Sequence, residues 1–310
     1  MNSFTVTKND EGLSLYKFSG RILANAPGSF IYKSLRNKDI RLNGKKALGN
    51  EILKEGDEVL FRFPDVQFES LSGTDRVPVK EHDINKYCTV VYEDDDIIVC
   101  DKKAGVLSQK AKAADYSLNE ALLSYVNHTG GAFTPSVCNR LDTNTTGLVA
   151  FAKTYRGARE LNDAFKERST EKYYLAAVFG DVKEGGILKG ELSKDHKENR
   201  VSIKEGGGET VLTAYEPLMH NTYRGIPVTL LKVRLYTGKT HQIRAHLAAS
   251  GMPVAGDPKY GDTELNKRAG LSKQMLHAFK LLLPGREPFY AKAPEKFTEL
   301  FPEYNPGYSH

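Results

Sequence analysis

The chain has 310 residues, of which 40% are hydrophobic and 27% charged, and it carries a formal net charge of +5. This is the composition of a globular protein with room for one large domain or two. No stretch approaches the length of a transmembrane helix, and the first residues lack the basic and apolar regions of a signal peptide. Cys88, Cys100 and Cys138 have no metal-type spacing. We therefore expect a cytoplasmic protein with reduced thiols, no metal site and no membrane partner.

Positive charge is concentrated near the start of the chain. Residues 12–63 hold ten Lys or Arg and five Asp or Glu, so this segment alone carries +5 and the remainder is neutral. Apolar residues at helical spacing predict two short helices on either side of Pro27-Gly28, and Asn43-Gly44 predicts a turn after a short strand. A basic surface beside a neutral body suggests a unit that grips a polyanion. A solvated face without a partner is the alternative.

The chain changes character twice after residue 63. Residues 64–86 combine Pro, Ser and Gly with few apolar residues, which predicts a linker. Residues 87–310 show short apolar strands, and a triple Asp at 94–96 suits a hairpin turn better than a metal site. Strands are expected at 90–92, 97–100, 147–152, 173–179, 211–215 and 228–235, and helices at 117–127, 154–167 and 240–250. This order predicts an α+β fold, in which a domain with a mixed or antiparallel sheet follows a small α+β domain.

One candidate site is the segment Asn139-Arg140-Leu141-Asp142-Thr143-Asn144-Thr145-Thr146-Gly147. It leads into the apolar run at 148–151, so Asp142 is expected on a loop at the mouth of a buried strand. A carboxylate in such a place is held rigidly yet remains reachable. The alternative is a turn whose Asp and Thr side chains bond only the local backbone.

A second candidate is the start of a predicted helix within residues 237–247. Thr240 can cap this helix, and Gln242 and Arg244 offer planar donors. Arginine can clamp a carboxylate through two parallel hydrogen bonds. An ordinary polar helix start is the alternative.

A third candidate is a predicted strand at residues 172–178. Its side chains alternate, so Tyr173 and Tyr174 point to opposite sides of the sheet. One of them can belong to the core while the other faces a site. The pattern alone favours the core for both.

Together the three segments resemble the RluA-type pseudouridine synthases. The first is similar to that family's catalytic signature, His-Arg-Leu-Asp-x-x-Thr-Ser-Gly, with Asn139 in place of the usual His. Residues 237–247 resemble its arginine motif, and Lys172-x-Tyr174 resembles its tyrosine motif. Residues 101–106 resemble its entry segment, where Lys103 replaces the usual Pro. Residues 12–63 are similar to an S4-type RNA-binding module, and the RluC/RluD group of the family pairs the same two domains.

The resemblance implies an RNA-modifying isomerase. The reaction is redox-neutral, which fits a chain without a Walker loop or a dinucleotide-binding glycine motif, so no cofactor is expected. Asp142 matches the catalytic carboxylate, Arg244 the cation that keeps it ionised, and Tyr174 the ring that faces the base. Substrate contacts are expected from Arg140, Leu141, Thr240, Gln242 and Ile243, and RNA contacts of the N-terminal domain from Lys33, Arg36, Lys38, Arg41 and Lys45.

Two other functions fit some of these residues. A ribosome-assembly factor could keep the fold and bind RNA without chemistry, although an intact set of Asp142, Arg244 and Tyr174 argues against it. A base-excising glycosylase could use the same flipped base and carboxylate, and it would release free uracil. The expected partner is structured RNA, above all ribosomal RNA, which is recognised largely by shape. The expected oligomeric state is a monomer.

Overall fold

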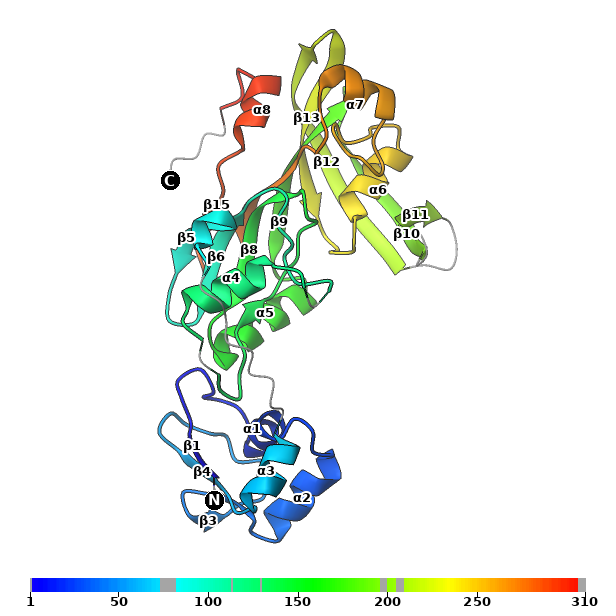
Figure 1. The fold of residues 1–310 in the computed structure, drawn as a ribbon. Coiled ribbons are helices and arrows are strands. Elements are labelled where there is room, and N and C mark those ends of the chain that lie inside the picture. Colours follow the sequence, from blue (N-terminus) through cyan, green and yellow to red (C-terminus); the bar gives the residue numbers. More distant parts are fainter. Residues whose placement is uncertain are drawn as a thin grey trace.

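A computed structural model describes residues 2–72, 82–112, 114–128, 130–195, 200–204 and 209–305. Two sheets organise the chain, a small one near the N-terminus and a long one that runs through the rest of the molecule (Figure 1). Helices α4 and α5 lie along one half of the long sheet, and α6 and α7 lie along the other half (Figure 1). Within the described ranges, no helix has the length and apolar character needed to cross a membrane.

The N-terminal unit packs short helices against the small sheet. Helix α1 (Leu15–Ile22) begins at Ser14, whose side chain accepts a hydrogen bond from the Lys17 N–H, and α2 (Gly28–Arg36) begins after Pro27. These are the two helices that the sequence predicts. The sheet is antiparallel, with the order β1 (Asn2–Thr5), β4 (Glu58–Phe61), β2 (Ile40–Leu42), β3 (Lys45–Lys46).

Part of the expected linker at 64–86 is structured. Residues 65–71 form helix α3 (Asp65–Leu71), and its Phe68 is buried against Phe4 and Phe61 of the small sheet. Leu71 of the same helix packs against the cluster that contains Phe68, so two apolar side chains anchor this segment. Residues 73–81 of the expected linker lie outside the described residues.

The long sheet has the strand order β11-β10-β12-β13-β9-β14-β8-β6-β5, with β15 paired to β14 and β7 paired to β8. All of these neighbours are antiparallel except β14 and β8, which run parallel. The strands are β5 (Cys88–Glu93), β6 (Ile97–Lys102), β7 (Ser136–Val137), β8 (Thr146–Ala152), β9 (Glu171–Phe179), β10 (Gly186–Asp195), β11 (Arg200–Lys204), β12 (Glu209–Tyr223), β13 (Ile226–Leu235), β14 (Leu276–Leu282) and β15 (Phe289–Tyr290). The predicted α+β fold with a mixed sheet is therefore confirmed.

The helices that the sequence predicts around this sheet are all present. They are α4 (Leu118–Tyr125), α5 (Tyr155–Lys166) and α6 (Gln242–Ala249), joined by α7 (Thr263–Ala269), α8 (Glu295–Leu300) and the short helix η1 (Ile84–Lys86). Helix α5 begins at Thr154, whose hydroxyl accepts a hydrogen bond from the Gly157 N–H at 3.0 Å. A capping residue followed by an apolar stripe explains why this prediction succeeded.

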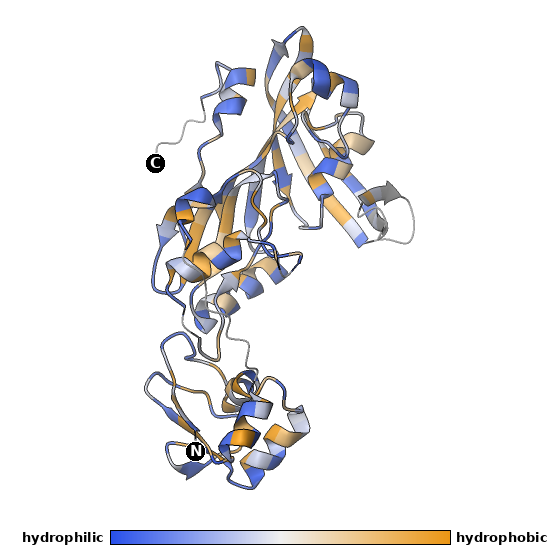
Figure 2. Ribbon diagram, in the orientation of Figure 1, coloured by the Kyte–Doolittle hydropathy of each residue, from blue (hydrophilic) through white to orange (hydrophobic). Residues whose placement is uncertain are grey.

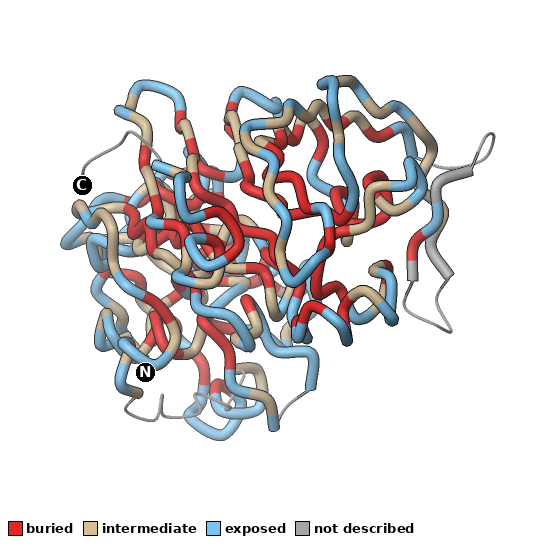
Figure 3. Tube along the Cα trace, turned by 90° about the horizontal axis from the view of Figure 1, so that it is seen from above, coloured by how far each residue is buried: buried red, intermediate tan, exposed pale blue. Residues whose placement is uncertain are grey.

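The central strands β6, β8, β9 and β14 of the long sheet are buried on both faces, whereas β12 is buried only in part. Hydrophobic residues mark the strands of this part of the sheet in Figure 2, and buried segments run through the middle of the body in Figure 3. On β6, Ile97 joins a cluster that contains Leu161 of α5, whereas Ile98 joins a cluster that contains Leu122 of α4. Helices α4 and α5 thus cover opposite faces. The α4 cluster continues into α6, where it includes Ile243.

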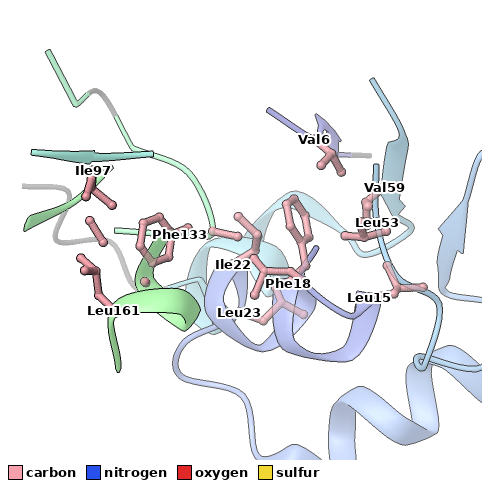
Figure 4. Close-up of a cluster of buried hydrophobic side chains, with 14 of the residues drawn as sticks. Val6, Leu15, Phe18, Ile22, Leu23, Leu53, Val59, Ile97, Phe133 and Leu161 are labelled. Carbon is pink, nitrogen blue, oxygen red and sulfur yellow. The ribbon is translucent and has the colours of Figure 1, made fainter. Parts of the chain in front are cut away.

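The N-terminal unit contacts the body of the protein through α1. Ile22 and Phe133 belong to one buried cluster that spans both parts (Figure 4). Arg21 lies over the rings of Phe133 and Tyr155, 5.6 Å from each centroid. Asp10 accepts a hydrogen bond from the Phe133 N–H at 2.6 Å. These contacts dock the unit on the side of the sheet that α5 covers.

Candidate active site

Asp142 lies on the loop between β7 and β8, and the start of β8 holds this loop in place. A Cβ at Gly147 would stand 2.2 Å from the carbonyl oxygen of Ala278 on β14, and the φ of Gly147 is +111°. Both facts require glycine at this position. One residue earlier, Thr146 Oγ1 lies 2.8 Å from Nδ1 of the buried His277. The loop is therefore fixed to β14, while the Asp142 side chain remains 24% exposed.

Two carboxylates share the guanidinium of Arg244, near the start of α6. Nη1 donates to Oδ2 of Asp142 at 2.7 Å, and Nε and Nη2 form a bidentate pair with Asp257 at 2.6 and 2.8 Å. Burial opposes the charge of Arg244, but the hydrogen bonds with Asp257 and the charge of Asp142 outweigh it and raise the Arg244 pKa. Burial likewise opposes the charge of Asp257, yet Arg244 keeps its pKa below the usual value. The buried pair aims one N–H at the exposed carboxylate.

An apolar wall lies beside this ion pair. Tyr174 of β9, Leu141 of the loop and Ile243 of α6 are each buried and belong to the same cluster. Burial, and then the charge of Asp142, raise the pKa of Tyr174, so its hydroxyl stays protonated at neutral pH. This hydroxyl makes no hydrogen bond to any side chain or backbone group that the structure describes. The site thus offers a flat ring next to a carboxylate.

A fully buried lysine, Lys102, supports the Asp142 loop by hydrogen bonds to the backbone. The Lys102 ammonium donates to the carbonyl oxygens of Lys103, Val106 and Thr143 at 3.1, 2.8 and 3.0 Å. Thr143 directly follows Asp142, so the ammonium ties the entry segment to the loop. Burial lowers the pKa of Lys102 to about 8, against the opposing effect of the Asp142 charge. The site therefore holds a second cation near the carboxylate.

His241 lies at the edge of the same site. Its Nε2 is 3.9 Å from Oδ2 of Asp142, beyond hydrogen-bond distance, and its Nδ1 is 3.0 Å from the Tyr260 hydroxyl. Its φ of +55° places it in the left-handed region immediately before α6. Burial lowers the pKa of His241, although Asp142 raises it, so the imidazole is neutral at physiological pH.

Comparison with known proteins assigns the chain to a family. Residues 96–249 match the family model for RNA pseudouridylate synthase. The chain is 34% identical over 300 residues to ribosomal large subunit pseudouridine synthase C of Rickettsia bellii, with 92% of this chain and 96% of the relative covered. The chain belongs to the RNA pseudouridine synthase family. The protein of the same name from Haemophilus influenzae is 30% identical over 290 residues, with 89% and 85% covered.

Solved structures share the fold of this synthase. Human RNA pseudouridylate synthase domain containing 1 matches with a TM-score of 0.57 at 27% identity, covering 70% of this chain and 87% of that chain. Human RNA pseudouridylate synthase domain containing 4 matches with a TM-score of 0.56 at 21% identity, covering 68% and 90%, and this likeness concerns the fold alone. The assignment to the RluA type is confirmed, and with it an isomerase reaction on RNA.

The structure differs from two expectations near the start of α6, the substrate contact of Gln242 and the capping role of Thr240. Gln242 is 2% exposed, and its amide bonds Thr237, Thr213 and the Leu212 carbonyl at 2.8 to 3.1 Å. It anchors α6 to β12 instead of facing the site. Thr240 does not cap α6, because the left-handed His241 occupies the cap position without a capping side chain. Thr240 is exposed beside the site.

The remaining expected contacts lie at or near the surface of the synthase. Arg140 is exposed next to Leu141, and it makes no hydrogen bond or ion pair with a described residue. In the N-terminal unit, Lys33, Arg36, Lys38 and Lys45 are exposed and Arg41 is half-buried, and none of them forms an ion pair within the described ranges. The five residues come from α2, β2, β3 and the turn between α2 and β2.

Both departures from the family signature have structural roles. Asn139 accepts a hydrogen bond from the Ala150 N–H at 2.7 Å and donates to the Leu148 carbonyl at 3.3 Å, so it supports β8 behind the Asp142 loop. The Lys103 N–H donates to the Tyr87 carbonyl at 2.9 Å. Proline could not make that bond. Lys103 therefore extends the pairing of β5 and β6 by one residue.

Sequence reasoning missed Lys102, Asp257 and His241 as parts of the site. Each stands inside or beside a motif that the sequence displays, but none carried a signal of its own. Asp257 follows Gly256, whose φ of +75° marks a tight turn, and a buried carboxylate in such a turn needs a cation. The fold, and not the local sequence, brings Arg244 next to Asp257.

Proposed function

We propose that this synthase converts uridine to pseudouridine in ribosomal RNA, with Asp142 as the catalytic carboxylate. The observation that carries the assignment is the 2.7 Å pair of Asp142 and Arg244, in which the carboxylate stays 24% exposed while the guanidinium is buried. The substrate class follows the names of the relatives from Rickettsia bellii and Haemophilus influenzae, which refer to the large ribosomal subunit.

The reaction exchanges one glycosidic bond for another. The bond from the sugar to a uracil nitrogen breaks, the base turns, and a bond from the sugar to a uracil carbon forms. That carbon loses a proton and the freed nitrogen gains one, so atoms and electrons balance without a co-reactant. An ionised carboxylate can act as the nucleophile or the base in this exchange. Arg244 keeps Asp142 ionised and aimed.

The apolar side chains hold the base while it is detached. Tyr174 offers its ring to the loose uracil, and Leu141 and Ile243 exclude water around it. Reaching a uridine inside structured RNA requires flipping the nucleotide out of its stack. Arg140 projects from the same loop as Asp142, and we assign it to the gap that the uridine leaves.

The N-terminal unit grips the RNA in this proposal, in the manner of an S4-type module. Five basic side chains supply the surface, namely Lys33, Arg36, Lys38, Arg41 and Lys45. None of them is neutralised by a described carboxylate. An unpaired basic surface of this kind binds phosphates and releases counterions, which makes affinity depend on salt.

The proposal is tested by mapping pseudouridine in ribosomal RNA from cells with and without the gene, and by incubating the purified protein with RNA that lacks the modification. A uridine that is converted in both experiments supports the proposal. Binding without conversion would favour the assembly factor, and release of free uracil would favour the glycosylase. We further propose a cytoplasmic monomer, which cell fractionation and light scattering of the purified protein test.

A further inference from the structure

Two cations without an anion lie close to the proposed site. Arg168 lies in the short connection between α5 and β9, and Lys172 is the second residue of β9, so the two cations are four residues apart at one turn of the chain and the charge of Arg168 lowers the pKa of Lys172. Across the part of the chain that the structure describes, neither side chain forms an ion pair or a hydrogen bond. By contrast, Lys239 in the loop after β13 pairs with Glu209 at 2.5 Å. The two cations repel one another, and no carboxylate compensates for this.

The partial burial of Lys172 makes its positive charge energetically unfavourable. Its side chain is only partly exposed, and its ammonium lies 5.8 Å from the centre of the Phe165 ring. Burial, and then the charge of Arg168, lower its pKa. The contact with the ring is favourable, but it does not replace all of the hydration that burial removes from the charge. A ligand anion between the two cations would remove that cost.

The ammonium also lies close to residues of the site. Lys172 precedes Tyr174 by two positions on β9, so the two side chains leave the strand toward the same side, about 7 Å apart. A Cβ at Gly238 would stand 3.5 Å from the Lys172 Nζ. Gly238 belongs to the loop that connects β13 to His241 and Arg244. The Lys172 side chain therefore starts about one nucleotide from the ring that faces the base, and its ammonium lies beside the loop that carries His241.

We infer that Lys172 and Arg168 bind a backbone phosphate of the RNA next to the target uridine. Lysine supplies a compact charge and arginine a planar fork, and both suit phosphate oxygens. The contact would hold the sugar in place while the base detaches and turns. The inference rests on the proposed function, since it assumes that the uridine reaches Asp142. It adds a binding site for the strand that carries the uridine.

The test measures affinity and turnover with a short RNA centred on the uridine that the mapping experiment identifies. Lys172→Met keeps the length of the side chain and its packing on Phe165 but removes the charge. It should weaken RNA binding about tenfold, since a hydrogen bond to a charged group contributes on this scale. The slope of log affinity against log salt should fall by about 0.7 for one lost single-strand phosphate. Lys172→Arg should retain most of the affinity.

Lys166→Met is the matched control, because Lys166 is an exposed lysine at the end of α5, two residues before Arg168. It should change the affinity less than twofold, a bound set by the weak effect of exposed charges. Methylphosphonates placed one at a time around the uridine should identify one phosphate whose neutralisation weakens wild type and Lys166→Met but not Lys172→Met. Equal losses in the two lysine variants, or a methylphosphonate effect that persists in Lys172→Met, would overturn the inference.

Stability separates this role from a structural one. Lys172→Met should unfold at about the same temperature as wild type, because removing a partly buried charge and losing its contact with the Phe165 ring have opposite effects on stability. A lower melting temperature with an unchanged salt slope would show that Lys172 serves the fold alone. If wild type converts no uridine, the proposed function fails first. If wild type is active and Lys172→Met binds RNA normally, only the phosphate site fails.

Discussion

At the scale of single residues, hydrogen bonds link three charged side chains of the site, from Asp257 through Arg244 to the partly exposed Asp142. Asp257 is buried and fixes Arg244, and Arg244 presents one N–H to Asp142. Lys102 ties the backbone next to Asp142 to the entry segment. Each link is a hydrogen bond to a charged group, the stronger kind in proteins. The carboxylate is thereby positioned from two sides.

The first prediction concerns the buried pair. Asp257→Ala removes both hydrogen bonds to Nε and Nη2 of Arg244 and leaves a buried charge with one partner. Its free energy of unfolding should fall by about 3–5 kcal/mol, the usual cost of breaking such a pair. Asp142→Ala should cost far less, because Arg244 keeps Asp257. Chemical denaturation of both variants checks this, and equal losses of stability would contradict the account.

The second prediction concerns pH. Burial lowers the pKa of Lys102 to about 8. Above that pH the neutral amine has two N–H groups for three carbonyl oxygens, and Asp142 loses a nearby positive charge. Turnover should therefore fall above pH 8, whereas stability should rise between pH 8 and 10.5, because the unfolded lysine, with its ordinary pKa of 10.5, binds the proton more tightly.

The control for this prediction is Lys102→Met. It should be slow at every pH, because three carbonyl oxygens and the neighbouring carboxylate have lost the ammonium, and its pH profile should lack the fall near pH 8. If the methionine variant keeps that fall, another group causes it.

At the scale of elements, the β8–β14 contact decides where the Asp142 loop lies. The sequence predicts β8 from its apolar run and α5 from its apolar stripe, and it predicts α6 although the expected cap, Thr240, is not the residue at that position. It does not predict that β8 and β14 are parallel neighbours. Because 123 residues separate Ala152 at the end of β8 from Leu276 at the start of β14, only tertiary packing brings the two strands together.

The same limit applies to single side chains of the elements. Gln242 has the donors of a ligand-binding residue, but the fold turns its amide toward β12. Phe68 lies in a mostly polar segment that was expected to be a linker, and in helix α3 it packs against Phe4 of β1. In both cases the deciding contact comes from residues distant in sequence. The resemblance to a family predicted Asp142, Arg244 and Tyr174 together, because it carries tertiary information that each motif alone lacks.

The third prediction tests the β8–β14 contact. Gly147→Ala places a methyl group 2.2 Å from the Ala278 carbonyl oxygen, so β8 and β14 must separate. Gly180→Ala is the matched control, because its φ of +103° imposes backbone strain but open space surrounds it. The control should lose about 1–3 kcal/mol of stability from strain alone. Gly147→Ala should lose clearly more, and turnover should fall with it. Similar melting temperatures would refute the claimed contact.

At the scale of the whole molecule, the N-terminal unit is docked on the body. Phe133 lies under Arg21 and bonds Asp10 through its N–H. A buried cluster crosses the same boundary. The charge of residues 12–63 predicts a separate module, and composition could not predict this interface. These contacts between the N-terminal unit and the body therefore fix the distance from the basic surface to Asp142.

The fourth prediction follows from that docking. Deleting residues 1–72 removes the basic surface together with α3, so RNA affinity should fall and its dependence on salt should become flatter. The remaining domain should fold but melt at a lower temperature, because Phe133 becomes exposed. Fluorescence anisotropy at several salt concentrations and thermal unfolding measure the two effects. An unchanged salt slope would show that the unit does not grip RNA.

The measurement that tests the central claim most directly is the single-turnover rate of Asp142→Asn on the target RNA, with RNA affinity measured in parallel. The amide keeps the size of the side chain but cannot act as an ionised nucleophile or base. The account predicts that conversion to pseudouridine is abolished while RNA affinity stays within a few fold of wild type, because the phosphate contacts remain. Substantial conversion by Asp142→Asn would contradict the assignment of the catalytic carboxylate.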